Sequence, residues 1–359
     1  MHVPDGMINL PVSAAAGVVA AGAVAVSLRG ARRELGSGPL AEGHGAERTA
    51  PLAGLVAAFV FAVQMLNFPV AAGTSGHLLG GALAAILVGP YTGVLCIAVV
   101  LLMQGILFAD GGLTALGVNI TVMGVVTVIV SYGIFRGLLR ILPRKRRSVT
   151  VSAFVAALVS VPAAAAAFTL LHAIGGTTHI PVGKVLTAMV GVHVLIGIGE
   201  AAITALTVGA VIAVRPDLVH GARGLAAPLK LRVGGELVDA PAPAPVAAAG
   251  SRSPRGLLAA GLGTALLLAG VVSFYASASP DGLEKVAADK GIDRKIEEHA
   301  AADSPLADYG IKDISNTRLS GGLAGMIGVG ATVVVGSGIF YVVHRRRTPA
   351  NAPVATGRS

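Results

Sequence analysis

The 359-residue sequence is poor in charges and in aromatic rings. Charged residues make up 13% of it and hydrophobic residues 54%, whereas a soluble domain carries about 25% charged residues, so an ordinary soluble globule is excluded. There is no Trp, and aromatic residues total 4%, which makes a stacking platform for nucleic-acid bases improbable. The single cysteine, Cys96, excludes a disulfide framework and a thiolate zinc site.

What the sequence has instead is a series of apolar runs, each long enough to cross a bilayer at about 20 residues per span. They are Leu10–Leu28, Leu52–Phe68, Leu113–Phe135, Val149–Leu171, Val185–Val214, Leu257–Phe274 and Gly322–Val343. The run His77–Phe108 is too long for one span, and Gly89-Pro90 breaks it, so we expect it to cross twice or to re-enter without crossing. The predicted fold is an all-α polytopic membrane protein, with a seven-helix bundle followed by a two-helix C-terminal module.

Basic residues cluster after particular spans and predict the orientation. The clusters are Arg29, Arg32 and Arg33; Arg136, Arg140, Arg144, Lys145, Arg146 and Arg147; Arg215, Arg223, Lys230 and Arg232; and Arg345, Arg346 and Arg347. Since basic loops stay in the cytoplasm, we expect the N-terminus outside and the C-terminus in the cytoplasm. The stretch Met1–Asn9 has no Lys or Arg, unlike the basic start of a signal peptide, so the first span is predicted to be an uncleaved helix.

The composition predicts four segments. Residues 1–220 form the first transmembrane domain, and the Pro/Ala-rich residues 221–254 form a semi-extended cytoplasmic linker. Residues 255–347 form the second module, whose extracytoplasmic loop, 277–320, is net negative. Such a loop attracts cations weakly, although a solvated loop is the simpler interpretation. Residues 348–359 are expected to be a disordered tail.

The first six residues, "MHVPDG", suggest a metal chelate. The free amine of Met1, the deprotonated backbone nitrogen of His2 and its Nδ1 close a five-membered and a six-membered ring around one ion. Loss of an amide proton requires a strongly polarising late first-row ion, which favours Ni²⁺, Cu²⁺ or Co²⁺ over Mg²⁺ and Ca²⁺. Pro4, Asp5 and Gly6 predict a tight turn that folds the terminus over the first helix. A frayed, solvated terminus is the alternative.

His77 is the predicted fourth ligand. It lies in "AAGTSGHLLGG", just after the second span returns to the outer face, so the topology places it at the same membrane surface as Met1 and His2. Three chelate nitrogens and one imidazole give a plane of four nitrogens, which suits Ni²⁺ or Cu²⁺. A polar helix start is the simpler explanation for a lone His there.

Further polar residues lie within the spans. His193 and Glu200 are two helical turns apart on one face, and ionisable groups inside a span are costly and usually functional. We expect these two, with Asn119, to orient the metal ligands from behind or to relay protons, unless they form a simple packing pair. His172 and His179 are interpreted as loop residues.

At "MHVPDGMINLPVS", "GTSGHLLGG" and "GVHVLIGIGEA" the sequence resembles the CbiM/NikM family, the substrate-binding membrane subunits of nickel and cobalt energy-coupling-factor transporters. The resemblance covers about Met1–Val214 and implies metal capture at the outer face by Met1, His2 and His77. The second module, with "PDGLE" at Pro280–Glu284, is similar to the small companion subunit whose outer loop helps load the metal. One departure is Val122, where members of the family often carry a second Asn.

The resemblance also implies partners. The only Gly-Lys pair of the first module, Gly183-Lys184, has Thr178 where a Walker A loop requires Gly, so ATP must be hydrolysed by other chains. By resemblance these are a pair of cytoplasmic ATPases and a coupling transmembrane subunit, which would contact small residues on the first three helices. The implied function is uptake of Ni²⁺ or Co²⁺, the latter for cobalamin biosynthesis, across a bacterial cytoplasmic membrane. The sequence does not choose between the two ions.

Two other functions are considered. One is a metal channel or carrier that needs no ATPase. The other is an intramembrane serine protease of the rhomboid type, because Gly73-Thr74-Ser75-Gly76 fits a GxSG pattern and His193 could act as a base. Against the protease, we expect Ser75 in a surface turn, and no nucleophile elbow is recognisable.

Overall fold

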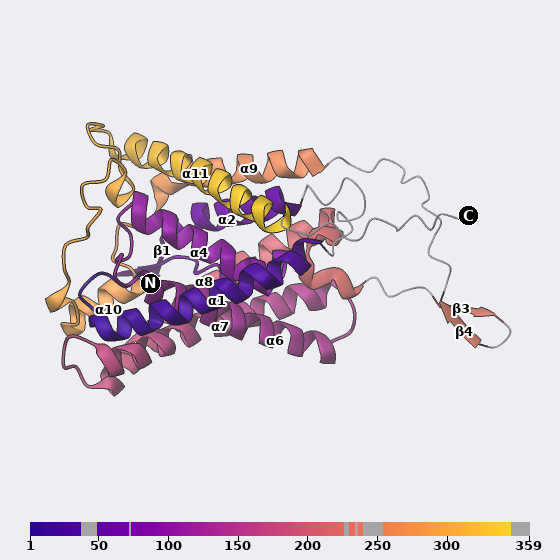
Figure 1. Cartoon of the computed structure of the whole chain (residues 1–359), viewed down its shortest axis with the longest axis horizontal. Coiled ribbons are helices and arrows are strands. Elements are labelled where there is room, and N and C mark those ends of the chain that lie inside the picture. The colour runs from indigo at the N-terminus through magenta and orange to yellow at the C-terminus, as the bar shows by residue number, and fades with distance from the viewer. Residues whose placement is uncertain (37–48, 72, 226–229, 234–235, 240–253, 346–359) are drawn as a thin grey trace, which may run out of the picture.

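The computed structural model describes residues 1–36, 49–71, 73–225, 230–233, 236–239 and 254–345 (Figure 1). Most of these residues are helical, which confirms the predicted all-α class. The α-helices are α1 (Leu10–Gly36), α2 (Thr49–Gln64), α3 (Gly81–Val88), α4 (Pro90–Leu107), α5 (Leu116–Asn119), α6 (Thr127–Ile141), α7 (Arg146–Gly175), α8 (Val182–Val214), α9 (Pro254–Gly270), α10 (Gly282–Lys290) and α11 (Thr317–Arg345). Within the described residues, strands form two short antiparallel pairs, β1 (Phe68–Ala71) with β2 (Thr74–Gly76) and β3 (Lys230–Val233) with β4 (Glu236–Asp239).

Seven helices in the described part of the chain are long and apolar enough to cross a membrane. Five lie before residue 215, and one of them, Leu116–Ile141, consists of α5, α6 and the residues that join them end to end. Helices α9 and α11 supply the other two. The remaining helices of the first module are shorter, with 16 residues in α2 and 8 in α3. The predicted architecture, a polytopic helical bundle followed by a two-helix module, is therefore confirmed.

The ambiguous run between His77 and Phe108 traverses the bundle twice. Gly89, at φ 103°, separates α3 from α4 in a conformation that favours glycine. At the start of α4, the N–H of Thr92 donates to Glu34, in the last turn of α1, at 2.7 Å. Helix α4 therefore begins at the end of the bundle far from the N-terminus. The chain after Phe108 is back beside the N-terminus, where the N–H of Gly112 donates to the carbonyl of Val3 at 2.9 Å.

A π-helical segment, Ile120–Val126, joins α5 to α6 in the middle of the predicted Leu113–Phe135 span. Such a segment inserts one extra residue into the helical turn and is frequent at functional sites. Here it follows Asn119 directly, and Asn119 binds the N-terminus. The sequence did not predict this irregularity.

The second module packs on the first along α2. Helices α9 and α11 both contact α2 and each other (Figure 1). Glycine permits the close approach: a β-carbon at Gly325 of α11 would lie 2.7 Å from the carbonyl oxygen of Ala269 in α9. Small residues at such crossings are typical of helix packing in lipid.

The polar segment between α9 and α11 folds back over the end of the bundle that holds the N-terminus. Main-chain hydrogen bonds fasten it there: Ser277 N donates to Asn67 O at 2.7 Å, and Glu297 N donates to Asp5 O at 3.0 Å. Asp308 N also donates to the carbonyl of residue 108, at 2.9 Å. The interpretation of this segment as a freely solvated loop is therefore wrong, because main-chain bonds to the first module fix its position.

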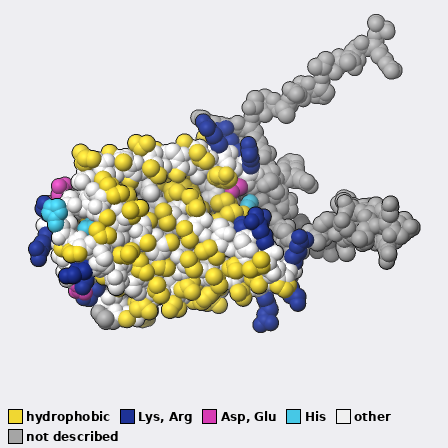
Figure 2. All heavy atoms as spheres, turned by 90° about the horizontal axis from the view of Figure 1, so that it is seen from below, with side chains coloured by type: hydrophobic (Ala, Val, Ile, Leu, Met, Phe, Trp, Pro, Cys, Tyr) yellow, Lys and Arg dark blue, Asp and Glu magenta, His cyan; other side chains and the backbone are white. Residues whose placement is uncertain are grey.

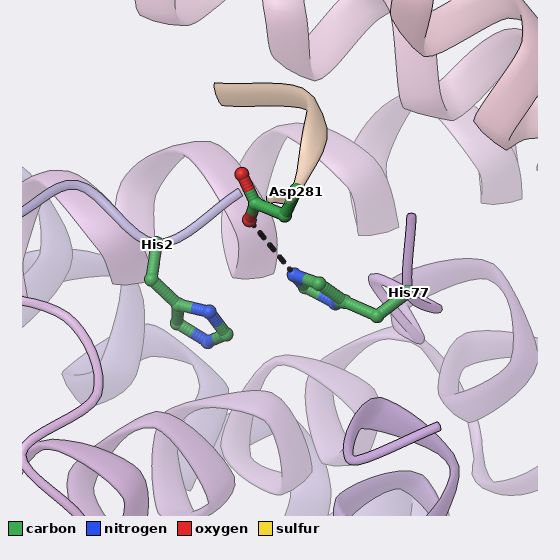
Figure 3. A group of neighbouring side chains, drawn as sticks. All are labelled: His2, His77 and Asp281. Carbon is green, nitrogen blue, oxygen red and sulfur yellow. Dashed lines mark ion pairs between the residues drawn. The ribbon is translucent and has the colours of Figure 1, made fainter. Parts of the chain in front are cut away.

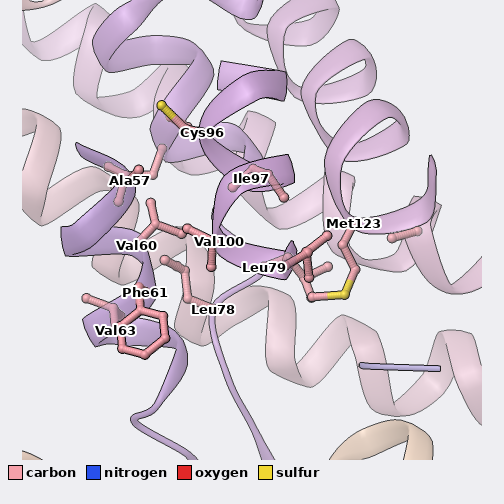
Figure 4. Packing of buried hydrophobic residues seen from close by; sticks show 14 of the residues in the cluster. Ala57, Val60, Phe61, Val63, Leu78, Leu79, Cys96, Ile97, Val100 and Met123 are labelled. Atoms are coloured by element: carbon pink, nitrogen blue, oxygen red, sulfur yellow. The ribbon is translucent and has the colours of Figure 1, made fainter. Parts of the chain in front are cut away.

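The hydrophobic core surrounds the segment that carries His77. Figure 4 shows Leu78 and Leu79 packed among side chains of α2, α4 and the π-helical segment, including Val60, Ile97 and Met123. All five of these side chains are buried. Since interiors are packed like organic crystals, this core fixes the backbone on either side of the His77 imidazole.

The outer surface is apolar between two charged ends. Figure 2 shows a broad band of hydrophobic side chains along the bundle, with Lys and Arg gathered at its ends. Large aliphatic side chains of the long helices face outward, such as Val18 of α1 and Leu206 of α8, each 74% exposed. A soluble monomer rarely exposes such an area, so this band is the lipid-facing surface.

Much of the predicted linker, 221–254, lies outside the described residues, as does the predicted tail, 348–359. Within the linker range, residues up to Leu225 continue a 3-10 helix that begins at His220, and β3 and β4 pair as a hairpin.

Candidate metal centre

The N-terminus is inserted into the bundle. Met1 is 3% exposed and Val3 is fully buried. Asn119, at the end of α5, clamps Val3 from both sides: Val3 N donates to Asn119 Oδ1 at 2.8 Å, and Asn119 Nδ2 donates to Val3 O at 3.1 Å. The frayed-terminus alternative does not describe this arrangement, because the first three residues are fixed by buried hydrogen bonds.

A turn behind the terminus holds it in place. Asp5 accepts hydrogen bonds from Thr114 N at 2.8 Å and from Leu113 N at 3.2 Å, just before α5. Gly6 has φ 79°, and a β-carbon there would clash with the backbone of Lys295. The turn therefore needs glycine for both its conformation and its close contact with the second module.

His77 lies in the extended segment between β2 and α3. Its Nδ1 is 2.9 Å from the carbonyl oxygen of Leu78, which fixes the proton on Nδ1 and leaves the Nε2 lone pair free. That Nε2 is 2.5 Å from the terminal amine of Met1. The residues after His77 are held by Glu200 of α8, whose carboxylate accepts from Leu79 N at 2.7 Å and Gly80 N at 3.1 Å. Glu200 thus positions the segment that carries the imidazole.

The His2 ring stacks on the His77 ring, with centroids 5.0 Å apart and planes 19° from parallel. Its Nε2 is 3.1 Å from Oε1 of Gln104, which accepts a hydrogen bond when that ring nitrogen carries the proton. Nδ1 is 3.2 Å from Asp110 Oδ1. Burial lowers the pKa of His2 to about 4, against the opposing effect of Asp110, so the ring is neutral near pH 7.

Asp281, from the second module, completes the cluster (Figure 3). Its Oδ2 is 2.5 Å from the Met1 amine and 3.5 Å from His77 Nε2. Burial raises the pKa of Asp281, but the adjacent terminal ammonium and His77 outweigh burial and hold this pKa well below its usual value. One ligand atom each from His2, His77 and Asp281 lie within 4.8 Å of one another. The cluster offers two imidazoles, an amine and a carboxylate, a donor set suited to late transition metals.

The cluster opens on a cavity of about 820 Å³ between the two modules. Acidic residues from both modules line it, among them Asp110, Asp281, Glu284 and Asp293. Tyr309 of the second module donates from its hydroxyl to Asp110 Oδ2 at 2.6 Å. Burial and the Asp110 carboxylate raise the pKa of Tyr309, so its hydroxyl stays protonated. Arg318 also lines the cavity, but the acidic residues outnumber it, so the cavity attracts cations toward His2 and His77.

The structure thus brings Met1, His2 and His77 together and places Asn119 and Glu200 directly behind them. His193 is near but not in the cluster: its Nδ1 is 2.7 Å from Met189 O, and its Nε2 has no hydrogen-bond partner among the described residues. The interpretation of His172 as a loop residue is wrong, because it lies in the last turn of α7 and is 4% exposed.

Ser75 is also not where it was predicted. It is fully buried in β2 rather than in a surface turn, and its hydroxyl donates to the carbonyls of Ser279 and Pro280 at 2.7 and 3.2 Å. A hydroxyl that binds two carbonyl oxygens of the second module has a structural role, so the geometry gives no support to a serine nucleophile.

Asp281, Gln104 and Asp110 were not predicted as site residues. A signal existed for Asp281 alone: Asp281 and Glu284 have the D-x-x-E spacing of a helix capping box, which fixes the carboxylate at the start of a helix. Gln104 and Asp110 carry no such signal, because only the fold brings the end of α4 to His2.

Comparison with known proteins agrees with this geometry. Residues 2–218 match the family model CbiM, described as "Cobalt uptake substrate-specific transmembrane region", and residues 255–345 match the PDGLE domain. The chain is 32% identical to the cobalt transport protein CbiM of Sorangium cellulosum over 224 aligned residues. This alignment covers 61% of this chain and 94% of that protein. It is 41% identical to the fused nickel transport protein NikMN of Rhodobacter capsulatus over 138 aligned residues. This alignment covers 38% of this chain and 36% of that protein. The crystal structure of a transition metal transporter aligns with a TM-score of 0.50 and 27% identity, over 60% of this chain and 93% of that one.

Proposed function

Since the chain belongs to the CbiM family of cobalt-uptake substrate-specific transmembrane regions, we propose that it captures Ni²⁺ or Co²⁺ at its buried amino terminus. The ligands are the Met1 amine, the His2 backbone nitrogen, His2 Nδ1 and His77 Nε2. One observation carries the proposal: the amine lies 2.5 Å from an imidazole nitrogen 76 residues away in the sequence.

The chemistry of the donors supports a late transition ion. Three nitrogens of Met1 and His2 close two fused chelate rings, and His77 supplies the remaining position of a four-nitrogen plane. Hard ions such as Mg²⁺ and Ca²⁺ prefer oxygen ligands, whereas imidazole and amide nitrogens suit Ni²⁺ and Co²⁺. Binding must expel a proton from the terminal ammonium and one from the His2 amide, so affinity rises with pH.

The groups behind the ligands support the same proposal. Asn119 fixes the depth of the terminus, Glu200 fixes the His77 segment, and Gln104 contacts Nε2 of His2, the ring nitrogen that is not a proposed ligand. Partners of this kind orient metal ligands and are worth roughly 10–100-fold in affinity.

The charge distribution supports an orientation with the metal centre outside the cell. The ends of α1 and α6 far from the centre carry Arg29, Arg33, Arg136 and Arg140, and basic residues stay on the cytoplasmic side. The acidic cavity then faces the exterior of the cytoplasmic membrane, and the chain delivers its ion inward. Energy comes from partner ATPases through a coupling transmembrane subunit, which contacts exposed small and aliphatic residues of α1 such as Val18 and Val19.

The decisive experiment uses a removable amino-terminal peptide. The full chain is produced with a leader that a protease removes to leave Met1 as the first residue. We expect titration with Ni²⁺ and with Co²⁺ to show tight binding only after cleavage, since a preceding residue converts the Met1 amine into an amide and removes the terminal nitrogen of the chelate. His77→Ala, tested with Met1 free, should also lose tight binding. Equal affinity before and after cleavage would contradict the proposed chelate.

Transport is tested separately in liposomes. The chain reconstituted with a coupling subunit and ATPases of the energy-coupling-factor type should take up metal only with ATP. Uptake by the isolated chain without ATP would instead identify an independent carrier.

A further inference from the structure

We propose that Asp281 of the second module is a fifth ligand to the captured ion, so that the site is complete only when both modules are docked. This inference rests on the proposed function, since it adds an oxygen to the nitrogen plane of Met1, His2 and His77. It assigns the PDGLE segment a direct contact with the metal.

Asp281 Oδ2 lies beside two of the proposed nitrogen ligands, the Met1 amine and His77 Nε2. Ligand atoms about 2.0–2.1 Å from one ion lie about 3 Å apart when they occupy adjacent positions. Oδ2 is 2.5 Å from the Met1 amine and 3.5 Å from His77 Nε2, and these two nitrogens are 2.5 Å apart. Three donors from three distant parts of the sequence therefore stand within about 0.5 Å of the separation that a shared ion sets.

The two oxygens of Asp281 have separate tasks. Oδ1 accepts from Glu284 N at 2.8 Å, and the Glu284 carboxylate accepts from Asp281 N at 2.9 Å, which closes a capping box at the start of α10. Oδ2 is left to face the amine. Because the cap fixes the rotation of the carboxylate, Oδ2 cannot turn away from the site while α10 is formed.

The neighbours of Asp281 seat it on the first module. The carbonyl of Pro280 accepts from Ser75 N at 2.8 Å. A β-carbon at Gly282 would come within 2.7 Å of Ile196 and 3.1 Å of the His193 ring, so glycine lets the segment lie flat on α8. Leu283 is 1% exposed. Pro280, Gly282 and Leu283 thus dock the segment, while Asp281 and Glu284 aim one carboxylate oxygen at the amine.

The experiment compares Asp281→Asn with the wild-type chain, each purified at full length and loaded with Ni²⁺ alone or Co²⁺ alone. Asn is as good a helix cap as Asp, so the variant keeps α10 while it removes the anionic ligand. Asp281→Ser is a second variant that keeps a cap but is too short to reach the ion. Asp289→Asn, an exposed position that pairs with Lys285 on the same helix, is the matched charge control.

X-ray absorption at the metal edge counts the ligands, and calorimetric titration measures affinity. We expect five nitrogen or oxygen ligands in the wild type and in Asp289→Asn. Asp281→Asn should give four, with the pre-edge feature of square-planar Ni²⁺ and an affinity about 10–100-fold lower.

Two results would overturn the inference while leaving the proposed function intact. One is a wild-type chain that binds the ion in a plane of four nitrogens. The other is an Asp281→Asn chain with the wild-type ligand count, even if its affinity is lower, because Asp281 would then act only as a counter-charge. A wild-type chain that binds neither ion would overturn both.

Discussion

Replacement of Asn119 by Ala tests whether the buried amino terminus controls metal affinity. Asn119 is 1% exposed and makes both hydrogen bonds that hold Val3, at 2.8 and 3.1 Å. Its truncation leaves Val3 N without an acceptor. The carbonyl of Val3 keeps its second partner, the N–H of Gly112 at 2.9 Å. The change therefore loosens the terminus without touching any proposed ligand.

The size of the effect follows from these bonds. A buried donor left without an acceptor costs about 1–3 kcal/mol, and loss of the second bond costs about 0.5–1.5 kcal/mol. Entry of water into the space left by the side chain favours the lower end, about 2 kcal/mol. Since each 1.4 kcal/mol is a factor of ten, the docked terminus becomes roughly 30-fold less favourable. The dissociation constant for Ni²⁺ rises by up to the same factor, which is reached when the undocked terminus predominates in the metal-free variant.

The assay is calorimetric titration of the purified chain with Ni²⁺, with digestion by an aminopeptidase as a second measurement. Asn119→Ala should bind up to about 30-fold more weakly, and its terminus should be cleaved faster in the absence of metal. Thr121→Val is the control. Thr121 lies two residues after Asn119, and its hydroxyl donates to the carbonyl of Ala16 in α1 at 3.2 Å rather than to the terminus. If Asn119→Ala bound Ni²⁺ within about threefold of the control, the idea that docking of the terminus limits affinity would be refuted.

Three further outcomes are expected. Glu200→Gln leaves one acceptor oxygen for the N–H groups of Leu79 and Gly80, so metal affinity should fall about tenfold in a titration, and unchanged affinity would separate Glu200 from the site. Gly282→Ala forces a methyl group against α8 and should lower the free energy of unfolding by about 1–3 kcal/mol, read from denaturant melts; a neutral result would mean that the second module is not docked in solution. Because burial depresses the pKa of His2 to about 4, the unfolded terminus binds more protons below pH 6.5. Docking of the amino terminus into the bundle should therefore weaken as pH falls from about 6.5 to 4, and the contribution of His2 should stay constant above that range. Digestion of the metal-free chain by an aminopeptidase at a series of pH values measures this docking. A terminus that is equally protected at pH 4 and pH 7 would contradict the prediction.

Much of the architecture could be predicted because it depends on local sequence. The length of each apolar run sets a span, and the break at Gly89-Pro90 indicated that the run from His77 is divided in two; of the two predicted alternatives, the structure has the one in which it traverses the bundle twice. The predicted resemblance to the CbiM/NikM family, with a PDGLE module, is confirmed. Other local interpretations failed for a tertiary reason: His172 and Ser75 were expected at the surface, but packing against neighbouring elements buries both.

The order of residues along the chain determined which end of the bundle each ligand occupies. Span parity alone places Met1, His2 and His77 on one face, because each pair of crossings returns the chain to the same side. What the sequence could not determine is which side chains meet within that face. Asp281 reaches the amine across 280 positions, and Gln104 reaches His2 because α4 ends beside the terminus. These contacts depend on how helices pack and where a capped turn aims one oxygen, and only the tertiary structure decides that.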